Sequence, residues 1–545
     1  VFFLALIGII VWVVRQKQND SADYFLGGRD ATWLAIGASI FASNIGSEHL
    51  IGLAGAGASS GMAMAHWEIQ GWMILILGWV FVPFYSRSMV YTMPEFLERR
   101  YNPQSRTILS VISLVSYVLT KVAVTVYAGG LVFQQVFGIK ELWGIDFFWI
   151  AAIGLVVLTA LYTIFGGMKS VLYTSVLQTP ILLLGSLIIL VLGFKELGGW
   201  DEMMRVCGAV TVNDYGDTMT NLIRSNDDAN FPWLGALIGS AIIGFWYWCT
   251  DQFIVQRVLS GKNEKEARRG TIFGAYLKLL PVFLFLIPGM IAFALHQKYI
   301  GAGGEGFLPM LANGTANADA AFPTLVAKLL PAGVKGLVVC GILAALMSSL
   351  ASLFNSSAML FTIDFYKRFR PETPEKKLVG IGQIATVVIV ILGILWIPIM
   401  RSVGDVLYTY LQDVQSVLAP GIAAAFLLGI CWKRTSAQGG MWGLIAGMII
   451  GLTRLGAKVY YSNAGEVADS TFKYLFYDMN WLFFCGWMFL FCIIVVIVVS
   501  LATEAPTAEK IQGLVFGTAT KEQKAATRAS WDHWDIIHTV IILAI

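Results

Sequence analysis

The chain has 545 residues, of which 57% are hydrophobic and only 13% are charged. Soluble domains carry about 25% charged residues, so this composition excludes an ordinary soluble protein and predicts a membrane protein. The formal net charge of +3 gives no sign of nucleic acid as a partner. The sequence shows no metal-ligand spacing and no nucleophile–base set, so we do not expect an enzyme.

Apolar stretches of about 20 residues, the length that crosses a bilayer, recur along the whole chain. We count about fourteen, near 1–14, 32–56, 60–84, 108–137, 144–166, 170–194, 232–256, 270–296, 334–364, 379–400, 404–431, 437–454, 479–501 and 533–545. The first and last are short, as in a sequence trimmed at both ends. With residue 1 outside, the cytoplasmic connections hold 24 of the 37 lysines and arginines and the outer ones 11. This bias follows the positive-inside rule and gives the predicted orientation.

Two spans interrupt their own apolar pattern at mid-depth. The first reads FASNIGSEH at residues 41–49, and the second reads GFWYWCTDQ at residues 244–252, where Gly244 marks a kink. Unpaired backbone groups are costly in lipid, so such an interruption persists only where it lines a cavity or faces protein. Two broken spans at corresponding places in two chain halves predict an inverted-repeat transporter with its substrate site between them.

The pattern therefore predicts an all-α polytopic membrane protein of about fourteen transmembrane helices. Two five-helix halves of opposite orientation each open with a discontinuous helix. The predicted parts are an N-terminal extra helix with its connection (1–31), a first repeat (32–196), an outer loop (197–231), a second repeat (232–431) and peripheral C-terminal helices (432–545).

Three ionisable side chains lie well inside predicted spans: His49, Glu68 and Lys278. Intramembrane charges usually line substrate or ion paths, although a buried ion pair that only holds helices together is the alternative. With an amide from Asn44 or Gln412, these groups supply the donors and acceptors that a polyhydroxylated ligand needs. An amino acid would call for an unpaired charge, so the pattern favours a sugar or another polyol.

An aromatic cluster, Trp246-Tyr247-Trp248, lies at the second break. An aromatic belt at headgroup depth is the alternative interpretation. Aromatic faces suit the apolar C–H faces of a sugar or cyclitol ring, and we expect Tyr247 to be a platform or gate over that ring.

Small and hydroxylated residues suggest a cation site. Ala345, Ser348 and Ser349 lie on one helix face, where close helix packing is the alternative role. Together with backbone carbonyls freed at the first break, at Ala42 and Ile45, they would form a five-oxygen site for sodium. The membrane potential would draw sodium inward by about 2.3 kcal/mol per 100 mV.

Seven strings spread along the chain carry a family resemblance. They are SADYFLGGR (21–29), GASIFASNIGSEHLIGLAGAG (37–57), YTMPEFLERRYN (91–102), YWCTDQFIVQRVLS (247–260), YLKLLPVFLFLIPGMI (276–291), ALMSSLASLFNSSAMLFTIDFY (345–366) and PGIAAAFLLGICWKR (420–434). They closely resemble the sodium/glucose cotransporters of the solute:sodium symporter family, in order and over nearly the whole chain. The resemblance implies a leucine-transporter-type 5+5 inverted repeat and sodium-coupled sugar uptake by alternating access.

The resemblance also implies roles for individual residues. The implied sugar site comprises Asn44, His49, Glu68, Lys278 and Gln412, with Tyr247 as inner gate, Trp248 in the same motif and Tyr408 as an outer-gate aromatic. The implied sodium ligands are Ala42, Ile45, Ala345, Ser348 and Ser349.

Some positions depart from the glucose-transporting relatives. The run Ser47-Glu48-His49 and the Trp67 that precedes Glu68 are closer to myo-inositol cotransporters of the same family, so a cyclitol stays open beside glucose or galactose. The "YTD" motif of relatives that couple two sodium ions reads Tyr173-Thr174-Ser175 here, and Ala351 replaces their Thr. We therefore predict one sodium per sugar.

Other functions remain open at this point. The solute could be an inositol, sialic acid or an amino acid, and the coupling ion could be a proton carried by His49 and Glu68. A non-transporting sugar sensor or a ligand-gated sodium conductance could use the same scaffold. The expected partners are the small solute, sodium and the lipid bilayer, and the expected location is the plasma membrane, or the inner membrane of a prokaryote.

Overall fold

The computed structural model describes residues 2–16, 20–46, 48–311, 314–403, 407–463 and 468–545. At positions 3, 119–120, 399–403, 407–413 and 463 it describes the backbone alone.

The first part of the chain is helical, with several short tight or widened turns (η) inserted between α-helices. Its elements are α1 (Phe2–Val14), α2 (Ser21–Leu26), η1 (Gly27–Arg29), α3 (Trp33–Asn44), η2 (Glu48–Leu53), α4 (Ala54–Ser60), η3 (Gly61–Met64), α5 (Ala65–Glu68), α6 (Gly71–Ile76), η4 (Leu77–Phe81), α7 (Val82–Ser88), α8 (Met93–Arg100), α9 (Pro103–Ser116), η5 (Tyr117–Val122) and α10 (Ala123–Phe137).

A two-residue antiparallel hairpin leads into the remaining helices. Its strands are β1 (Glu141–Leu142) and β2 (Ile145–Asp146), with Glu141 opposite Asp146. The helices up to the second break and beyond it are α11 (Phe147–Leu197), α12 (Trp200–Gly208), α13 (Trp233–Gly244), η6 (Phe245–Thr250), α14 (Gln252–Leu259), α15 (Glu264–Lys278), η7 (Val282–Leu286), α16 (Ile287–Gly301), η8 (Ala318–Ala320), α17 (Ala321–Leu329), α18 (Ala332–Met359), η9 (Leu360–Tyr366) and α19 (Lys367–Phe369). The last are α20 (Glu375–Val403), α21 (Leu407–Cys431), α22 (Ala437–Asn463), α23 (Thr471–Lys473), η10 (Tyr474–Asp478), α24 (Trp481–Ala502), α25 (Ala508–Ile511), α26 (Lys521–Ala529) and α27 (His533–Ala544).

Nine helical stretches of the described chain are long and apolar enough to cross a membrane, and four shorter apolar helices accompany them. The longest, α11, has 51 residues, which is about 77 Å at 1.5 Å per residue and more than twice the hydrocarbon thickness. It is interrupted at Gly167, where φ is 53° and ψ is −148°, between the two spans predicted there. A Cβ at this position would lie 2.4 Å from the carbonyl oxygen of Tyr24, so only glycine fits. The total of about fourteen helices and the two repeats stay predictions.

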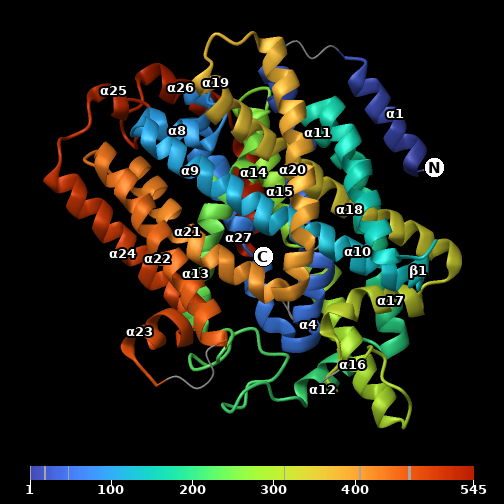
Figure 1. Ribbon diagram of the computed structural model, residues 1–545. Coiled ribbons are helices and arrows are strands. Elements are labelled where there is room, and N and C mark those ends of the chain that lie inside the picture. Colours follow the sequence, from blue (N-terminus) through green and yellow to red (C-terminus); the bar gives the residue numbers. More distant parts are fainter. Residues whose placement is uncertain (1, 17–19, 47, 312–313, 404–406, 464–467) are drawn as a thin grey trace.

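The connections that the charge bias assigns to the cytoplasm and to the outside lie at opposite ends of the helix bundle. Figure 1 shows α8, α19, α25 and α26 at one end of the bundle and α12 and α23 at the opposite end. The first group belongs to the Lys- and Arg-rich connections predicted to face the cytoplasm, and the second to the outer connections. The two groups of connections therefore lie at opposite ends of the bundle, and which end faces the cytoplasm stays a prediction.

Both predicted breaks are present, and the second lies near the end of its predicted segment, 244–252. Helix α3 ends at Asn44, and Ile45 leaves the helical region with ψ of 96°. In the second span Gly244 is helical (φ −61°, ψ −41°), and the chain leaves the helix only at Asp251 (ψ 127°). The predicted kink at Gly244 is therefore wrong. The Asp251 carboxylate caps α14 by accepting from the Phe253 N–H, a role that stabilises a new helix start there, whereas Gly244 leaves room for Gln70, whose Oε1 would lie 2.4 Å from an added Cβ.

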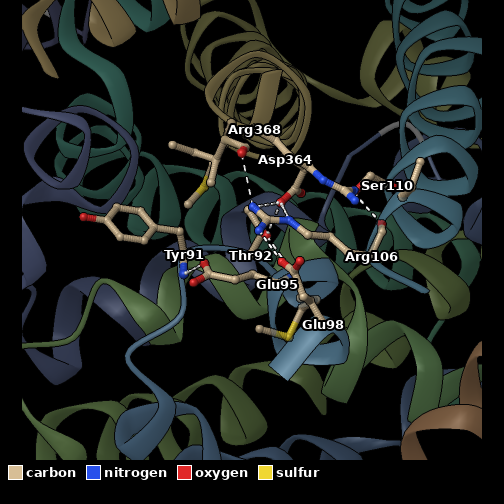
Figure 2. Close-up of polar contacts among 12 residues, drawn as sticks. Tyr91, Thr92, Glu95, Glu98, Arg106, Ser110, Asp364 and Arg368 are labelled. Atoms are coloured by element: carbon tan, nitrogen blue, oxygen red, sulfur yellow. Dashed lines mark hydrogen bonds and ion pairs between the residues drawn. The ribbon is translucent and has the colours of Figure 1, made fainter. Parts of the chain in front are cut away.

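A charged cluster ties three segments together at the end of the bundle that holds α8 (Figure 2). Arg106 of α9 contacts Glu98 of α8 at 2.6 Å and Asp364 of η9 at 2.6 Å. Thr92 also donates a hydrogen bond to the Asp364 carboxylate, at 2.8 Å. The Asp364 side chain is fully buried, so its charge depends on Arg106 for compensation.

Removing the Arg106 guanidinium should therefore destabilise the fold. We expect Arg106→Met to lower the free energy of unfolding by about 3–5 kcal/mol, because it leaves a buried carboxylate without its cation. Thermal melting of the purified protein measures the change. The matched control is Arg205→Met, whose pair with Glu202 is exposed and whose loss should leave the melting temperature unchanged. Equal melting temperatures for both variants would contradict this role of the cluster.

Candidate substrate and cation site

A small cavity of about 20 Å³ lies between the two broken spans. Its lining residues are Asn44, Glu48, His49, Trp67, Glu68, Gln70, Ile243, Gly244, Tyr247, Trp248, Lys278 and Gln415. Small-molecule sites usually enclose about 300–1,000 Å³. The polar groups around the cavity contact one another, and a ring-sized ligand would have to separate them.

An ion pair lies at the centre of the cavity wall. The Lys278 ammonium donates to Glu68 Oε2 at 2.5 Å, and His49 Nε2 lies 3.2 Å from the same oxygen. All three residues are 3% exposed or less. The charges of Lys278 and Glu68 compensate each other, and Lys278 faces the protein interior.

Asn44 extends this ion pair to the second break. Its Oδ1 accepts from Lys278 Nζ at 3.3 Å, and its Nδ2 donates to the Tyr247 hydroxyl at 3.0 Å. The structure thus brings five of the predicted residues into one hydrogen-bonded chain, which we call the polar chain: Tyr247, Asn44, Lys278, Glu68 and His49. Their role in binding a substrate remains a prediction.

Three members of the polar chain lie at the C-terminal ends of helices. Asn44 is the last residue of α3, Glu68 of α5 and Lys278 of α15. A cation is favoured at a helix C-terminus, and Pro281 begins a new turn just beyond Lys278 because proline cannot continue the helix.

Close packing of α3 on α15 brings Asn44 to Lys278. A Cβ at Gly37 would lie 2.8 Å from the Gly270 carbonyl, and a Cβ at Gly270 would lie 2.6 Å from Ile36. These two glycines therefore let the helix backbones approach each other, as small residues do in membrane bundles.

The aromatic residues at the second break face the protein interior. Tyr247 and Trp248 line the cavity and are 8% and 3% exposed, which contradicts the alternative of a headgroup belt for these two side chains. The rings meet edge to face at 4.9 Å. Lys278 Nζ lies 5.4 Å from the Trp248 ring, within the range of a cation–π contact.

A second buried ion pair lies beside the break at Asp251. Lys121 Nζ lies 2.7 Å from Asp251 Oδ2, and the Tyr117 hydroxyl donates to the other carboxylate oxygen. Lys121 also lies 4.7 Å from the centre of the Tyr247 ring. Sequence reasoning missed this pair, although a lysine inside an apolar span is itself a signal of a buried partner.

Three polar cavity residues were also missed: Glu48, Gln70 and Gln415. Glu48 could have been found, because it is ionisable and lies within the first break. Gln415 follows the predicted Gln412 by three residues on α21 and so lies on the same helix face. The side chains of Gln412 and Tyr408 lie outside the described part of the structure, so neither is placed.

The residues predicted to bind sodium lie at the end of α3 and on α18. Ser349 Oγ donates to the Ser43 carbonyl at 3.0 Å, and Ser348 Oγ lies 3.3 Å from Ser175 Oγ. Ala42 lies in the last turn of α3 and Ile45 just after its end, where carbonyls lack intrahelical donors and the helix dipole is negative. Hydroxyl and carbonyl oxygens at a broken helix fit a sodium ion. Ala345 belongs to the same helix as the two serines.

Apolar helices broken around a buried polar cavity are the architecture of a secondary transporter. Residues 24–447 match the Sodium:solute symporter family. The chain belongs to this family, and it is a multi-pass, sodium-coupled solute symporter.

Within this family, the chain is similar to particular transporters. The chain is 36% identical over 531 residues to sodium/myo-inositol cotransporter 2 of Homo sapiens, covering 95% of this chain and 78% of the relative. It is 37% identical over 539 residues to the sodium/myo-inositol cotransporter of Canis lupus familiaris, covering 94% and 74%. The solved structure of a Na+-coupled sialic acid symporter in a substrate-bound outward-open state superposes with a TM-score of 0.72 at 22% identity, over 93% of this chain and 98% of that one. This last likeness confirms the predicted fold class.

Proposed function

We propose that the symporter couples inward sodium movement to the uptake of a neutral polyol across the plasma membrane, with one sodium per substrate. The substrate class is a monosaccharide such as glucose or galactose, or a cyclitol such as myo-inositol. The polar chain carries this proposal, because its cation and anion compensate each other and its remaining atoms offer hydrogen bonds.

The charge balance of the polar chain favours a neutral ligand. Lys278 and Glu68 are 2.5 Å apart, so neither offers the free charge that an amino acid's carboxylate or ammonium group would need. Charged donors and acceptors form strong hydrogen bonds with neutral hydroxyls, and the Trp248 ring supplies an apolar face. The names of the relatives favour the cyclitol within this class.

Coupling is proposed to run through the end of α3. Ala42 and Ile45, the predicted sodium ligands, flank Asn44, a member of the polar chain. Sodium bound to this segment would order the backbone that carries Asn44, and the polyol would order the segment that binds sodium. Such coupling is reciprocal by linkage.

The proposed stoichiometry rests on the surroundings of Ser348. Its nearest polar neighbour on α11 is the hydroxyl of Ser175, at 3.3 Å. A second cation there would lack the carboxylate found in the relatives' YTD motif. In the transport cycle sodium binds first, the polyol follows, and Tyr247 and Tyr408 act as inner and outer gates.

Removing the Glu68 carboxylate should abolish sodium-driven uptake. Glu68→Ala deletes the group that holds both Lys278 and His49, so we expect uptake of labelled myo-inositol and glucose to fall to background. The measurement is uptake into proteoliposomes under an inward sodium gradient. Glu202→Ala, in the outer helix α12, serves as control and should transport normally. Normal uptake by a correctly folded Glu68→Ala protein would remove Glu68 from the site.

Removing one serine hydroxyl should weaken the response to sodium. We expect Ser349→Ala to raise the half-saturating sodium concentration, because the variant loses an oxygen ligand at the end of α3. The sodium dependence of uptake measures this. Ser357→Ala is the matched control, since this serine lies on the same helix and its buried hydroxyl has no hydrogen-bond partner among the described residues. An unchanged sodium dependence in Ser349→Ala would contradict the proposed cation site.

A further inference from the structure

Glu48 differs from Glu68, the other carboxylate that lines the cavity. It lies in the first broken segment, 41–49, where it begins η2; it lines the cavity and is half-buried. Within the described chain its carboxylate has no hydrogen-bond partner, although it lies close enough to interact electrostatically with Lys121, His49 and Lys278. The Glu68 carboxylate, by contrast, holds both Lys278 and His49.

The nearby ammonium groups are already engaged. Lys278 lies 2.5 Å from Glu68, and Lys121 lies 2.7 Å from Asp251. Glu48 is therefore a surplus carboxylate facing the cavity. A carboxylate within a membrane span is expensive and typically serves a ligand or ion, and this one lines the cavity between the two breaks.

Hydrogen-bond chemistry indicates which ring such a site prefers. A carboxylate only accepts hydrogen bonds, and its two oxygens can accept from two neighbouring hydroxyls. An inositol presents a hydroxyl donor on every ring carbon, whereas a pyranose has one ring oxygen that only accepts. An acceptor facing that ring oxygen would stay unpaired, and a site built to bond a hydroxyl discriminates strongly against an analogue that lacks it.

We propose that Glu48 is a specificity-determining residue that accepts hydrogen bonds from two adjacent hydroxyls of a cyclitol and so selects a fully hydroxylated carbon ring over a pyranose. This inference rests on the proposed function, because it assigns a role within the same site. Glu68 and Lys278 hold any neutral polyol, and Glu48 sets the preference between the two ring types.

Dissociation constants for myo-inositol and glucose, measured by calorimetry on the purified full chain in sodium chloride, test the proposal. The wild type should bind myo-inositol more tightly. Glu48→Gln, which replaces one acceptor by a donor at nearly the same shape, should lower the ratio of inositol to glucose affinity by at least about tenfold. Glu48→Asp, which keeps the charge, should restore part of this ratio. Glu68→Gln is the matched control and should weaken both ligands together.

Each other outcome has a definite meaning. An unchanged affinity ratio in Glu48→Gln, or a wild type that prefers glucose, overturns the role of Glu48. Equal loss of both ligands in Glu48→Gln makes Glu48 a general acceptor and also overturns it, as does a raised sodium requirement at a constant ratio. A wild type that binds neither ring in sodium contradicts the proposed function itself. The melting temperature of each variant without ligand confirms that it is folded.

Discussion

A transmembrane helix satisfies its backbone polar groups internally, and this chain departs from that rule at two points around one cavity. The two departures are resolved differently. At Asp251 the protein closes the break itself, because the carboxylate caps α14 and pairs with Lys121. Near Ile45 the Ser349 hydroxyl of α18 donates to the Ser43 carbonyl in the last turn of α3, and this is where we propose that sodium binds. Under the proposed function, protein groups alone hold the break at Asp251, whereas bound sodium orders the break at Ile45.

The mutual compensation of the Lys278 and Glu68 charges is the basis for proposing a neutral ligand in this cavity. The Glu68 carboxylate serves Lys278 and His49 through one oxygen, and Asn44 carries the network on to Tyr247. A buried ion pair of this kind contributes little to stability by itself. In the proposed function, it supplies strong hydrogen-bond donors and acceptors to a neutral polyol. Because the cavity is small, the proposed ligand would replace contacts within the protein by contacts with itself, and its binding would be coupled to a rearrangement of the helices.

Sequence reasoning located much of this site because charge is rare in a membrane span. His49, Glu68 and Lys278 stand out for that reason, and the structure brings them together. Sequence reasoning failed for residues whose role depends on the direction of the side chain. Gly244 was taken for the second kink because glycine is common at breaks, yet its smallness serves packing against Gln70. Glu48 and Gln415 were missed because periodicity assigns no face to a residue inside a break and does not choose between amides three residues apart.

The central claim is that sodium and a neutral polyol bind to the same broken segment and stabilise each other there. The most direct test is to measure the affinity for myo-inositol across sodium concentrations and the affinity for sodium across myo-inositol concentrations, by calorimetry on the same protein. We predict that each ligand strengthens the other by the same factor, within the 5- to 150-fold range typical of coupled sites. Affinities that are independent of the other ligand would contradict the claim.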